Sequence, residues 1–296
     1  MDDLVAQVAA GQYNRISRLQ LCELGLSANA IKHRVSSGRY VIVEEGVFAI
    51  APVLDHDPRG RWMAATLTQP GSTLSHLSSA VARGVLSFEG PFVTITRAGN
   101  GGTRRQGGML IHHSTLLEGE ITDLDGIPIT TMERTLLDIA GEQSGPALAR
   151  AVREAVRLAH TTLRRLGDAF GRYRGRRGIR ALAATVARYS GLPLERARSG
   201  AEIRAMEILR DEGKPTPRLN VRVAGEEADL SWPGWRLVVE IDGPPFHRDV
   251  GEDARKERVW REAGWTVRRL PSDDVYERPW RLLDVALPPN VQIGSP

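Results

Sequence analysis

The chain has 296 residues, a formal net charge of +4, and a composition that is 41% hydrophobic and 26% charged. This length is typical of two or three domains, and this composition is typical of folded proteins, so wholesale disorder is excluded. No apolar run is long enough to span a membrane, and the acidic start does not resemble a signal peptide. The single cysteine, Cys22, excludes internal disulfides and multi-cysteine zinc sites. We expect a cytoplasmic protein without membrane contact, whose metal sites would use carboxylates and histidines.

Arginine dominates the basic residues, because only Lys32, Lys214 and Lys256 of the 40 lysines and arginines are lysines. Arginine binds phosphates and guanine edges with two parallel hydrogen bonds, so this bias suits a nucleic-acid partner. A GC-rich coding sequence would enrich arginine equally well. Charge alone therefore does not decide the function.

The first fifty residues predict three short helices followed by a β-hairpin. Ser17 and Ser27 are good N-caps for the second and third helices, and Glu44-Glu45-Gly46 is a turn signal between two β-rich runs. This order is that of a winged helix-turn-helix, which we assign to residues 1–52. The expected elements are helices Asp2–Ala10, Ser17–Leu24 and Ala28–Ser37 and strands Tyr40–Val43 and Val47–Ile50.

The third helix has the pattern of a DNA-reading helix. Ile31 and Val35 lie four residues apart and are expected to face inward. The opposite face is short, polar and basic, as contacts in the major groove require. A plain helical subdomain with a solvated face is the alternative. The expected DNA-binding residues are Asn29, Lys32, His33 and Ser36 on the outer face, with Arg34 and Arg39 on flanking phosphates.

Four segments carry a resemblance to a known family: Ser17–Ala51, Thr73–Leu86, Phe92–Thr96 and Gly126–Ala140. In this order they resemble the AbiEi-type antitoxin proteins, with Gly46-Val47-Phe48 at the family's second wing strand. The resemblance implies a transcriptional autorepressor that is often the antitoxin partner of a nucleotidyltransferase toxin. It also implies a mixed α/β middle domain at residues 53–160. Composition and spacing do not themselves indicate a toxin.

Polar residues of the middle segment are interpreted as structural. Arg134 and Asp138 lie four apart on an expected helix, which predicts an ion pair within that helix. Ser75 and His76 fall at a helix start. His76, together with His112 and His113 at the end of an expected strand, could ligate a metal, but adjacent histidines on a strand point to opposite faces, so structural or surface roles are favoured. No catalytic site is expected here.

Residues 161–198 predict a basic helical connector, because apolar residues keep helical spacing while arginines crowd the surface positions. We expect four of these arginines to touch DNA phosphates. A solvated surface is the alternative. The four are Arg172, Arg174, Arg176 and Arg177.

Residues 199–296 predict an α/β domain. A helix should be followed by three strands, a charged helix and a last strand. Five of the six tryptophans lie in this part of the chain, which indicates a separate core. The expected elements are helices Ala201–Glu212 and Val250–Ala263 and strands Leu219–Val223, Glu227–Trp232, Leu237–Asp242 and Trp265–Leu270.

Carboxylates on these strands suggest metal-dependent phosphodiester hydrolysis. Glu240 and Asp242 are two apart and share a face of their strand, and Asp229 lies on the preceding strand. Buried acids need compensation, which Mg²⁺ would supply while it activated a water. His247 could then act as acid or base. The alternative is that Asp242-Gly243 is a turn and Glu240 pairs with an arginine such as Arg258.

The segments Asp229–His247 and Glu252–Leu270 resemble the endonuclease-like domain related to very-short-patch repair endonucleases, in the PD-(D/E)xK superfamily. The resemblance implies a restriction-endonuclease-like fold. Asp242 stands at the superfamily's lysine position, and Lys256 or Arg258 could replace that lysine. The resemblance assigns Asp229, Glu240 and Asp242 to the metal. Its catalytic pattern comprises Glu202, Asp229, Glu240, Asp242 and His247, with Asp253 also matching.

The sequence thus predicts an α/β protein, α+β overall, that binds double-stranded DNA. The leading hypothesis is a sequence-specific transcriptional repressor, of the antitoxin or prophage-immunity type, that needs no cofactor to bind. Its nuclease-fold domain would aid DNA binding or homodimerisation. One alternative is an active Mg²⁺-dependent endonuclease targeted by its winged helix. Another is an antitoxin that neutralises a toxin protein by direct contact.

Overall fold

The computed structural model describes residues 2–51, 57–115, 118–143, 145–243 and 250–288. Within these residues the chain is a mixed α/β protein with three β-sheets. Contacts divide it into two compact units, Met1–Val152 with Arg165–Thr185, and Arg153–Arg164 with Val186–Pro296. No helix in the described part combines the length and apolarity needed to span a bilayer.

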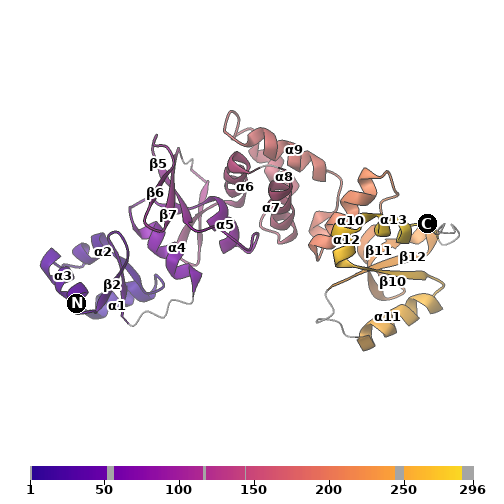
Figure 1. Ribbon diagram of the computed structural model, residues 1–296, viewed down its shortest axis with the longest axis horizontal. Coiled ribbons are helices and arrows are strands. Elements are labelled where there is room, and N and C mark those ends of the chain that lie inside the picture. Colours follow the sequence, from indigo (N-terminus) through magenta and orange to yellow (C-terminus); the bar gives the residue numbers. More distant parts are fainter. Residues whose placement is uncertain (1, 52–56, 116–117, 144, 244–249, 289–296) are drawn as a thin grey trace. The chain divides into compact units, whose positions relative to one another are not determined.

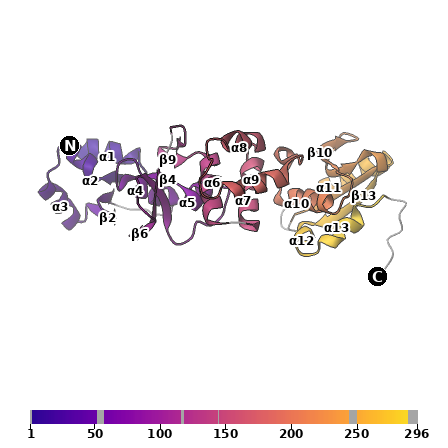
Figure 2. The same cartoon turned by 90° about the horizontal axis from the view of Figure 1, so that it is seen from above.

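The N-terminal segment alternates helices with short strands, and its three helices lie together in both views (Figures 1 and 2). Its sheet has the order β1-β3-β2, with both pairs antiparallel. The strand β1 was not predicted, because three residues are too short to show a period. The elements are α1 (Asp2–Ala10), β1 (Arg15–Ser17), α2 (Arg18–Glu23), α3 (Ala28–Ser36), β2 (Tyr40–Glu44) and β3 (Val47–Ile50).

Both predicted N-caps are present in this segment. The Ser17 hydroxyl accepts a hydrogen bond from the Gln20 amide, and the Gln20 side chain accepts one from the Ser17 amide, which forms a complete capping box. The Ser27 hydroxyl accepts from the Ala30 amide at the start of α3. Inside, Ile31 of α3 packs with Phe48 of β3 and the other buried apolar residues of the segment. This core fixes which face of α3 points outward.

The middle segment is a six-stranded mixed sheet with the order β6-β7-β5-β4-β9-β8. Two parallel pairs, β5 with β7 and β4 with β9, alternate with antiparallel pairs. The elements are α4 (Pro58–Leu67), β4 (Thr73–Leu74), α5 (His76–Ala82), β5 (Val93–Ala98), β6 (Arg104–Gln106), β7 (Met109–Ser114), β8 (Ile121–Leu124), β9 (Ile127–Thr130) and α6 (Met132–Glu142).

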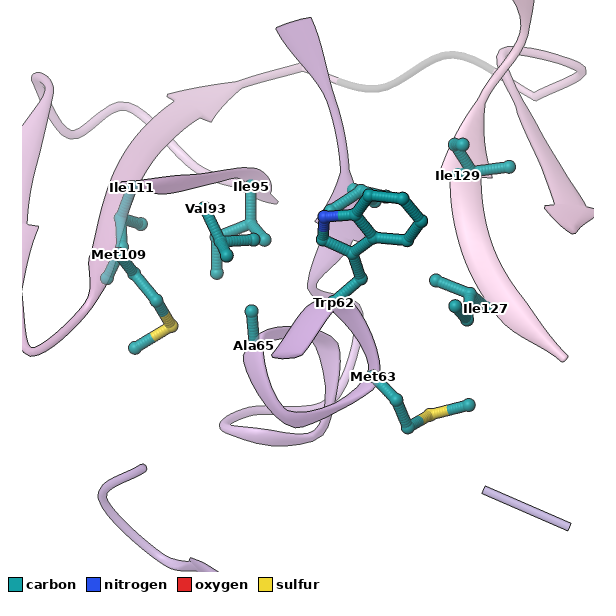
Figure 3. Packing of buried hydrophobic residues seen from close by; sticks show 10 residues of the cluster. Trp62, Met63, Ala65, Val93, Ile95, Met109, Ile111, Ile127 and Ile129 are labelled. Atoms are coloured by element: carbon teal, nitrogen blue, oxygen red, sulfur yellow. The ribbon is translucent and has the colours of Figure 1, made fainter. Parts of the chain in front are cut away.

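Helix α4 packs across this sheet. Asp57 caps the helix and Pro58 occupies its first turn, so the start is well defined. Figure 3 shows Trp62 and Ala65 directed toward the apolar residues of the strands, and Met63 belongs to the same buried cluster. The strand residues of this core are Leu74, Val93, Ile95, Met109, Ile111, Ile127 and Ile129. Burial of this apolar cluster holds the α4 helix on the sheet.

The predicted helical connector is helical only on either side of its arginine-rich centre. After α7 (Pro146–Arg157), the chain forms α8 (Leu163–Ala169) and α9 (Ile179–Tyr189), but residues 170–178 are turns without regular helix. Gly175 and Gly178 adopt φ angles of +80° and +87°, which a helix cannot accommodate. Gly178 also lies against α6, where an added Cβ would stand 2.4 Å from the Gly141 nitrogen. The turn therefore packs on the first unit.

The second unit contains a four-stranded sheet with the order β10-β11-β12-β13. The first three strands form an antiparallel meander, and α11 carries the chain across to β13, which is parallel to β12. The elements are α10 (Gly200–Asp211), β10 (Arg218–Val223), β11 (Glu226–Trp232), β12 (Leu237–Asp242), α11 (Val250–Glu262), β13 (Thr266–Pro271), α12 (Ser272–Glu277) and α13 (Pro279–Val285). The last two helices were not predicted.

Helices cover this sheet in two groups. Helices α10, α12 and α13 contact one another, and α11 lies apart from them (Figure 1). The indole of Trp260 anchors α11: it is fully buried against Val223, Ala228 and Val238, and its Nε1 donates to the Val223 carbonyl oxygen at 3.0 Å. The crossover helix is thus fixed to the strands that carry the acidic residues.

Candidate functional site

The outer face of α3 carries the side chains that the sequence predicted there. Asn29, Lys32, His33 and Ser36 are all exposed, whereas Ile31 is buried. The Ser36 hydroxyl donates to the His33 carbonyl oxygen at 3.0 Å, so it covers the end of the helix. Asn29, Lys32 and His33 remain as an exposed donor and acceptor surface on one helix face.

Arg34 has a different environment from its neighbours. Its guanidinium donates to Asp2 Oδ1 of α1 at 2.7 Å and lies 6.0 Å above the Tyr40 ring. The same ion pair holds the pKa of Asp2 below its ordinary value. Arg34 thus joins α3 to α1, while Arg39 is exposed. Of the two predicted phosphate contacts, only Arg39 keeps an exposed side chain.

The tip of the β2–β3 hairpin is acidic and is bound by the middle segment. Gln106 Nε2 donates to Glu45 Oε2 at 2.6 Å, and the Gly108 amide donates to Glu44 Oε1 at 3.2 Å. Burial raises the pKa of Glu44. Two carboxylates at the tip would repel a phosphate backbone, so we expect α3, and not the hairpin tip, to make the base contacts.

The four connector arginines do not share one environment. Arg172, Arg174 and Arg177 are exposed. Arg176 is half-buried, with its Nη1 3.2 Å from Glu120 Oε2 and its guanidinium 5.7 Å from the centre of the Tyr173 ring. Three of the four predicted phosphate contacts are therefore accessible, and Arg176 is engaged inside the first unit.

In the second unit, Asp229 of β11 and Glu240 of β12 are tied to each other's strands. The Asp229 amide donates to Glu240 Oε1 at 3.0 Å, and the Ile241 amide donates to Asp229 Oδ2 at 2.8 Å. This exchange requires the β11–β12 register and brings the two carboxylates together although eleven residues separate them. The sequence prediction that these acids share a site is consistent with this geometry.

Asp242, the third predicted acid, is paired with a cation. Arg269 of β13 stands beside Glu240 in the parallel register, and its Nη1 donates to Asp242 Oδ1 at 2.7 Å. The same guanidinium lies 3.4 Å from Asp253 Oδ2 and 3.5 Å from Glu257 Oε2 of α11. The sequence analysis overlooked Arg269, because only the parallel pairing of two distant strands places it here.

Of the two remaining predicted catalytic residues, Glu202 and His247, only Glu202 lies within the described residues. Glu202 of α10 is 4% exposed and accepts hydrogen bonds from the Arg198 amide at 2.9 Å and from Asn220 Nδ2 at 2.5 Å. Its charge adds to the field that raises the pKa of Asp229. Lys256 lies close enough to lower the pKa of Glu240. His247 lies outside the described residues.

Burial dominates the electrostatics of the Asp229 and Glu240 pair. Burial, followed by repulsion from Glu240, raises the pKa of Asp229 to about 7. Burial also raises the pKa of Glu240, against the hydrogen bond from the Asp229 amide and the charges of Arg269 and Lys256. Such a pair suits a site that receives a positive ligand.

The donor chemistry of this pair fits Mg²⁺, which takes oxygen ligands and often needs only one or two carboxylates. The three carboxylates that the sequence predicted as metal ligands are less suited to bind one ion together. Among the described residues, Asp229, Glu240 and Asp242 do not form a group whose ligand oxygens all lie within 4.8 Å of one another. The bond from Arg269 to Asp242 accounts for this, because it gives the third acid its own counterion.

A second group of titratable residues lies in the first unit and was not assigned from the sequence. His76 at the start of α5, His112 on β7 and Glu142 at the end of α6 each offer an atom within 4.8 Å of the others. The two imidazole rings stack, with centroids 3.9 Å apart. Burial lowers the pKa of His76 to about 3 and that of His112 to about 4, so both rings are neutral at pH 7.

The predicted ion pair inside α6 is confirmed, since Arg134 Nε donates to Asp138 Oδ1 at 2.8 Å. His112 and His113 are neighbours on β7, so strand alternation places them on opposite faces. The sequence marked His76 and His112 as possible ligands but favoured structural roles and did not indicate Glu142, because the three residues come from elements whose packing only the fold defines.

Comparison with known proteins assigns no family. No family model matches the chain, and no curated protein matches it. Among solved structures, the chain is similar to the RV2827C protein from Mycobacterium tuberculosis, at 18% sequence identity and a TM-score of 0.43. The match covers 74% of this chain and 82% of that protein.

The raised pKa values predict a stability gain for Glu240→Gln at high pH. The unfolded chain releases its protons near the ordinary pKa values of 3.8 and 4.5. The folded pair keeps a proton up to the raised pKa near 7. The free energy of unfolding should therefore fall as pH rises through this window. Glutamine cannot ionise but can still accept from the Asp229 amide. We expect the variant to be more stable than wild type by about 1–2 kcal/mol at pH 8 and by less at pH 5.

Urea denaturation at both pH values measures this difference. The control is Glu226→Gln, which removes a partly exposed carboxylate whose pKa is lowered by its ion pair with Arg255. That variant should show no gain at pH 8. An equal stability change of Glu240→Gln at pH 5 and pH 8 would contradict the assignment of a buried, repelling pair.

Proposed function

We propose that this protein is a sequence-specific, double-stranded DNA-binding transcriptional repressor, of the antitoxin-type autoregulator or prophage-immunity type. The observation that carries the proposal is the N-terminal segment. Its order α1-β1-α2-α3-β2-β3, with β3 between β1 and β2, is that of a winged helix-turn-helix. In that fold the helix equivalent to α3 enters the major groove.

The side chains of α3 support this role. Asn29 suits adenine, whose major-groove edge offers one donor and one acceptor, and Lys32 suits guanine or phosphate oxygens. Both are exposed on the face opposite buried Ile31. Arg34 supports the same role indirectly, because its ion pair with Asp2 braces α3 against α1. The helix is thus held by one face and presents the other.

For the second unit we propose a restriction-endonuclease-like domain that aids DNA binding or homodimerisation. The sequence of a meander, a crossover helix and a parallel fourth strand supports this assignment. Arg269 neutralises Asp242, the acid at the position where the superfamily has its lysine. The same guanidinium also lies beside Asp253 of α11. A cation committed in this way to three carboxylates is poorly placed to stabilise a reacting phosphate.

The reading helix gives a direct test. Asn29→Ala and His33→Ala should each weaken operator binding by about 1–3 kcal/mol, which is roughly 5- to 150-fold, where the side chain contacts a base edge. Binding is measured by gel shift on the DNA of the protein's own promoter region. The control is Gln7→Ala, which removes an exposed polar side chain from α1. Wild-type affinity in both α3 variants would refute this helix as the reader.

The connector arginines give a second test, which depends on their different environments. The triple variant Arg172, Arg174 and Arg177 to alanine should bind all DNA sequences more weakly. Its log–log salt dependence should flatten by about 0.9 for each lost phosphate contact. Arg176→Ala should leave the salt slope unchanged, because Glu120 holds that side chain. An unchanged slope in the triple variant would mean that these arginines do not touch DNA.

The second candidate function is an Mg²⁺-dependent endonuclease, and the raised pKa values of Asp229 and Glu240 favour it. Both carboxylates could hold Mg²⁺, which would polarise a phosphodiester and activate water. Operator binding in chelator and plasmid nicking in Mg²⁺ or Mn²⁺, on the same preparations, decide between the candidates. A repressor should bind in chelator, and its binding should survive Glu240→Gln. Metal-dependent nicking that Glu240→Gln abolishes would identify an endonuclease instead.

A further inference from the structure

The histidine group of the first unit has the arrangement of metal ligands. His112 Nε2 lies 3.4 Å from Glu142 Oε1, and His76 Nε2 lies 4.0 Å from the same oxygen. Around a tetrahedral zinc ion, with bonds of about 2.0–2.1 Å, neighbouring ligand atoms stand roughly 3.3 Å apart. The two separations from Glu142 are close to this value, but the imidazole rings stack with centroids 3.9 Å apart, so the rings must also turn before both Nε2 lone pairs point at one ion.

Both rings orient Nε2 toward the carboxylate in the same way. His76 Nδ1 lies 2.9 Å from the Ser75 hydroxyl, and His112 Nδ1 lies 3.0 Å from the Thr103 hydroxyl. An Nδ1–H that donates to such an oxygen leaves the lone pair on Nε2, which is the arrangement that supports metal-bound histidines. A hydroxyl can accept from Nδ1–H or donate to Nδ1, and the tautomer in which both Nδ1 atoms donate is the one that leaves both Nε2 lone pairs available for a cation.

Two further features point to a ligand at this position. His112 Nε2 and Asp138 Oδ2 are buried and have no hydrogen-bond partner, which is costly for polar atoms. In addition, His76 adopts a φ angle of +49°, in the left-handed region that a residue with a Cβ rarely occupies. Strain and unpaired buried polar atoms tend to occur together at functional sites.

We propose that His76, His112 and Glu142 bind a zinc-class transition-metal dication. Two imidazole nitrogens and one carboxylate oxygen are a donor set typical of zinc, and they favour it over Mg²⁺, which prefers oxygen ligands. Glu142 is partly exposed, so the site has a route to solvent and to a water as fourth ligand. The bound ion would join α5, β7 and α6.

The surrounding charges permit a dication here. Arg134 lies near His76, but it is neutralised by its ion pairs with Asp138 and Glu120. Arg177 acts on Glu142 from the connector. Asp138 Oδ2 lies 3.9 Å from His76 Nδ1, but the charge of Asp138 is already paired with Arg134. Glu142 therefore supplies the carboxylate charge that faces the ion.

The test measures Zn²⁺ binding to the full chain after chelator treatment, in a Cys22→Ser background that removes the exposed thiol. Competition with a chromophoric chelator gives stoichiometry and affinity, and Co²⁺ substitution reports tetrahedral coordination by its visible absorption. We expect one Zn²⁺ per chain. Glu142→Gln and His112→Asn should each weaken binding at least about 10- to 100-fold, the scale of a lost supporting contact. Mg²⁺ should not compete.

The matched control is His113→Ala, which removes the neighbouring histidine on β7 that points the other way. It should bind Zn²⁺ as wild type does. Glu142 is partly exposed at the end of its helix, so Glu142→Gln should fold, and thermal unfolding without metal checks this. Zn²⁺ should raise the unfolding temperature of wild type and of His113→Ala only. Absence of stoichiometric binding, or unchanged affinity in a folded Glu142→Gln, would overturn the proposal.

Discussion

The guanidinium of Arg134 is 2% exposed, and the groups that neutralise it organise the first unit. A buried charge without partners would cost several kcal/mol, so the chain must bring carboxylates to it. Asp138 comes from the same helix, Glu120 from the segment before β8, and Ser114 from the end of β7. Glu120 in turn holds Arg176, so the connector turn depends on the same charge.

The second unit treats buried charge differently. Asp229 and Glu240 are held by backbone amides, and their nearest side-chain cation, Arg269, donates to Asp242 instead. Backbone amides fix the two carboxylates in place without neutralising them. In the first unit the buried charges are paired and hold elements together. In the second unit the charge of the acidic pair is only partly balanced.

Much of the local structure followed from the sequence, because it rests on short-range chemistry. The caps Ser17 and Ser27, the inward side of α3 and the ion pair between Arg134 and Asp138 are all set by residues within four positions of one another. The strands that carry Asp229 and Glu240 were also predicted, since apolar runs mark them. The roles assigned to these residues stay predictions.

What the sequence could not indicate depends on packing between distant segments. Arg269 lies beside Asp242 because β13 pairs with β12 in parallel. His76 of α5 stacks on His112 of β7, and both lie near Glu142 of α6, because these three elements come together in the fold. The connector was misread for a related reason: its helical spacing is real, but Gly175 and Gly178 take backbone angles that break the helix. Spacing along the sequence indicates which face of a helix or strand a residue occupies. It does not indicate which residue of another element lies against that face.

The attachment of the β2–β3 hairpin to the middle sheet has a consequence for how the chain can be divided. Glu44 and Glu45 bond to residues of the β6–β7 hairpin, α4 contacts all three strands of the N-terminal sheet, and the Tyr13 hydroxyl donates to the Asp125 carbonyl oxygen. A fragment ending at residue 52 would lose every one of these bonds. The N-terminal segment and the middle sheet therefore belong to one compact unit, and a fragment that is to keep α3 in its present surroundings must include both.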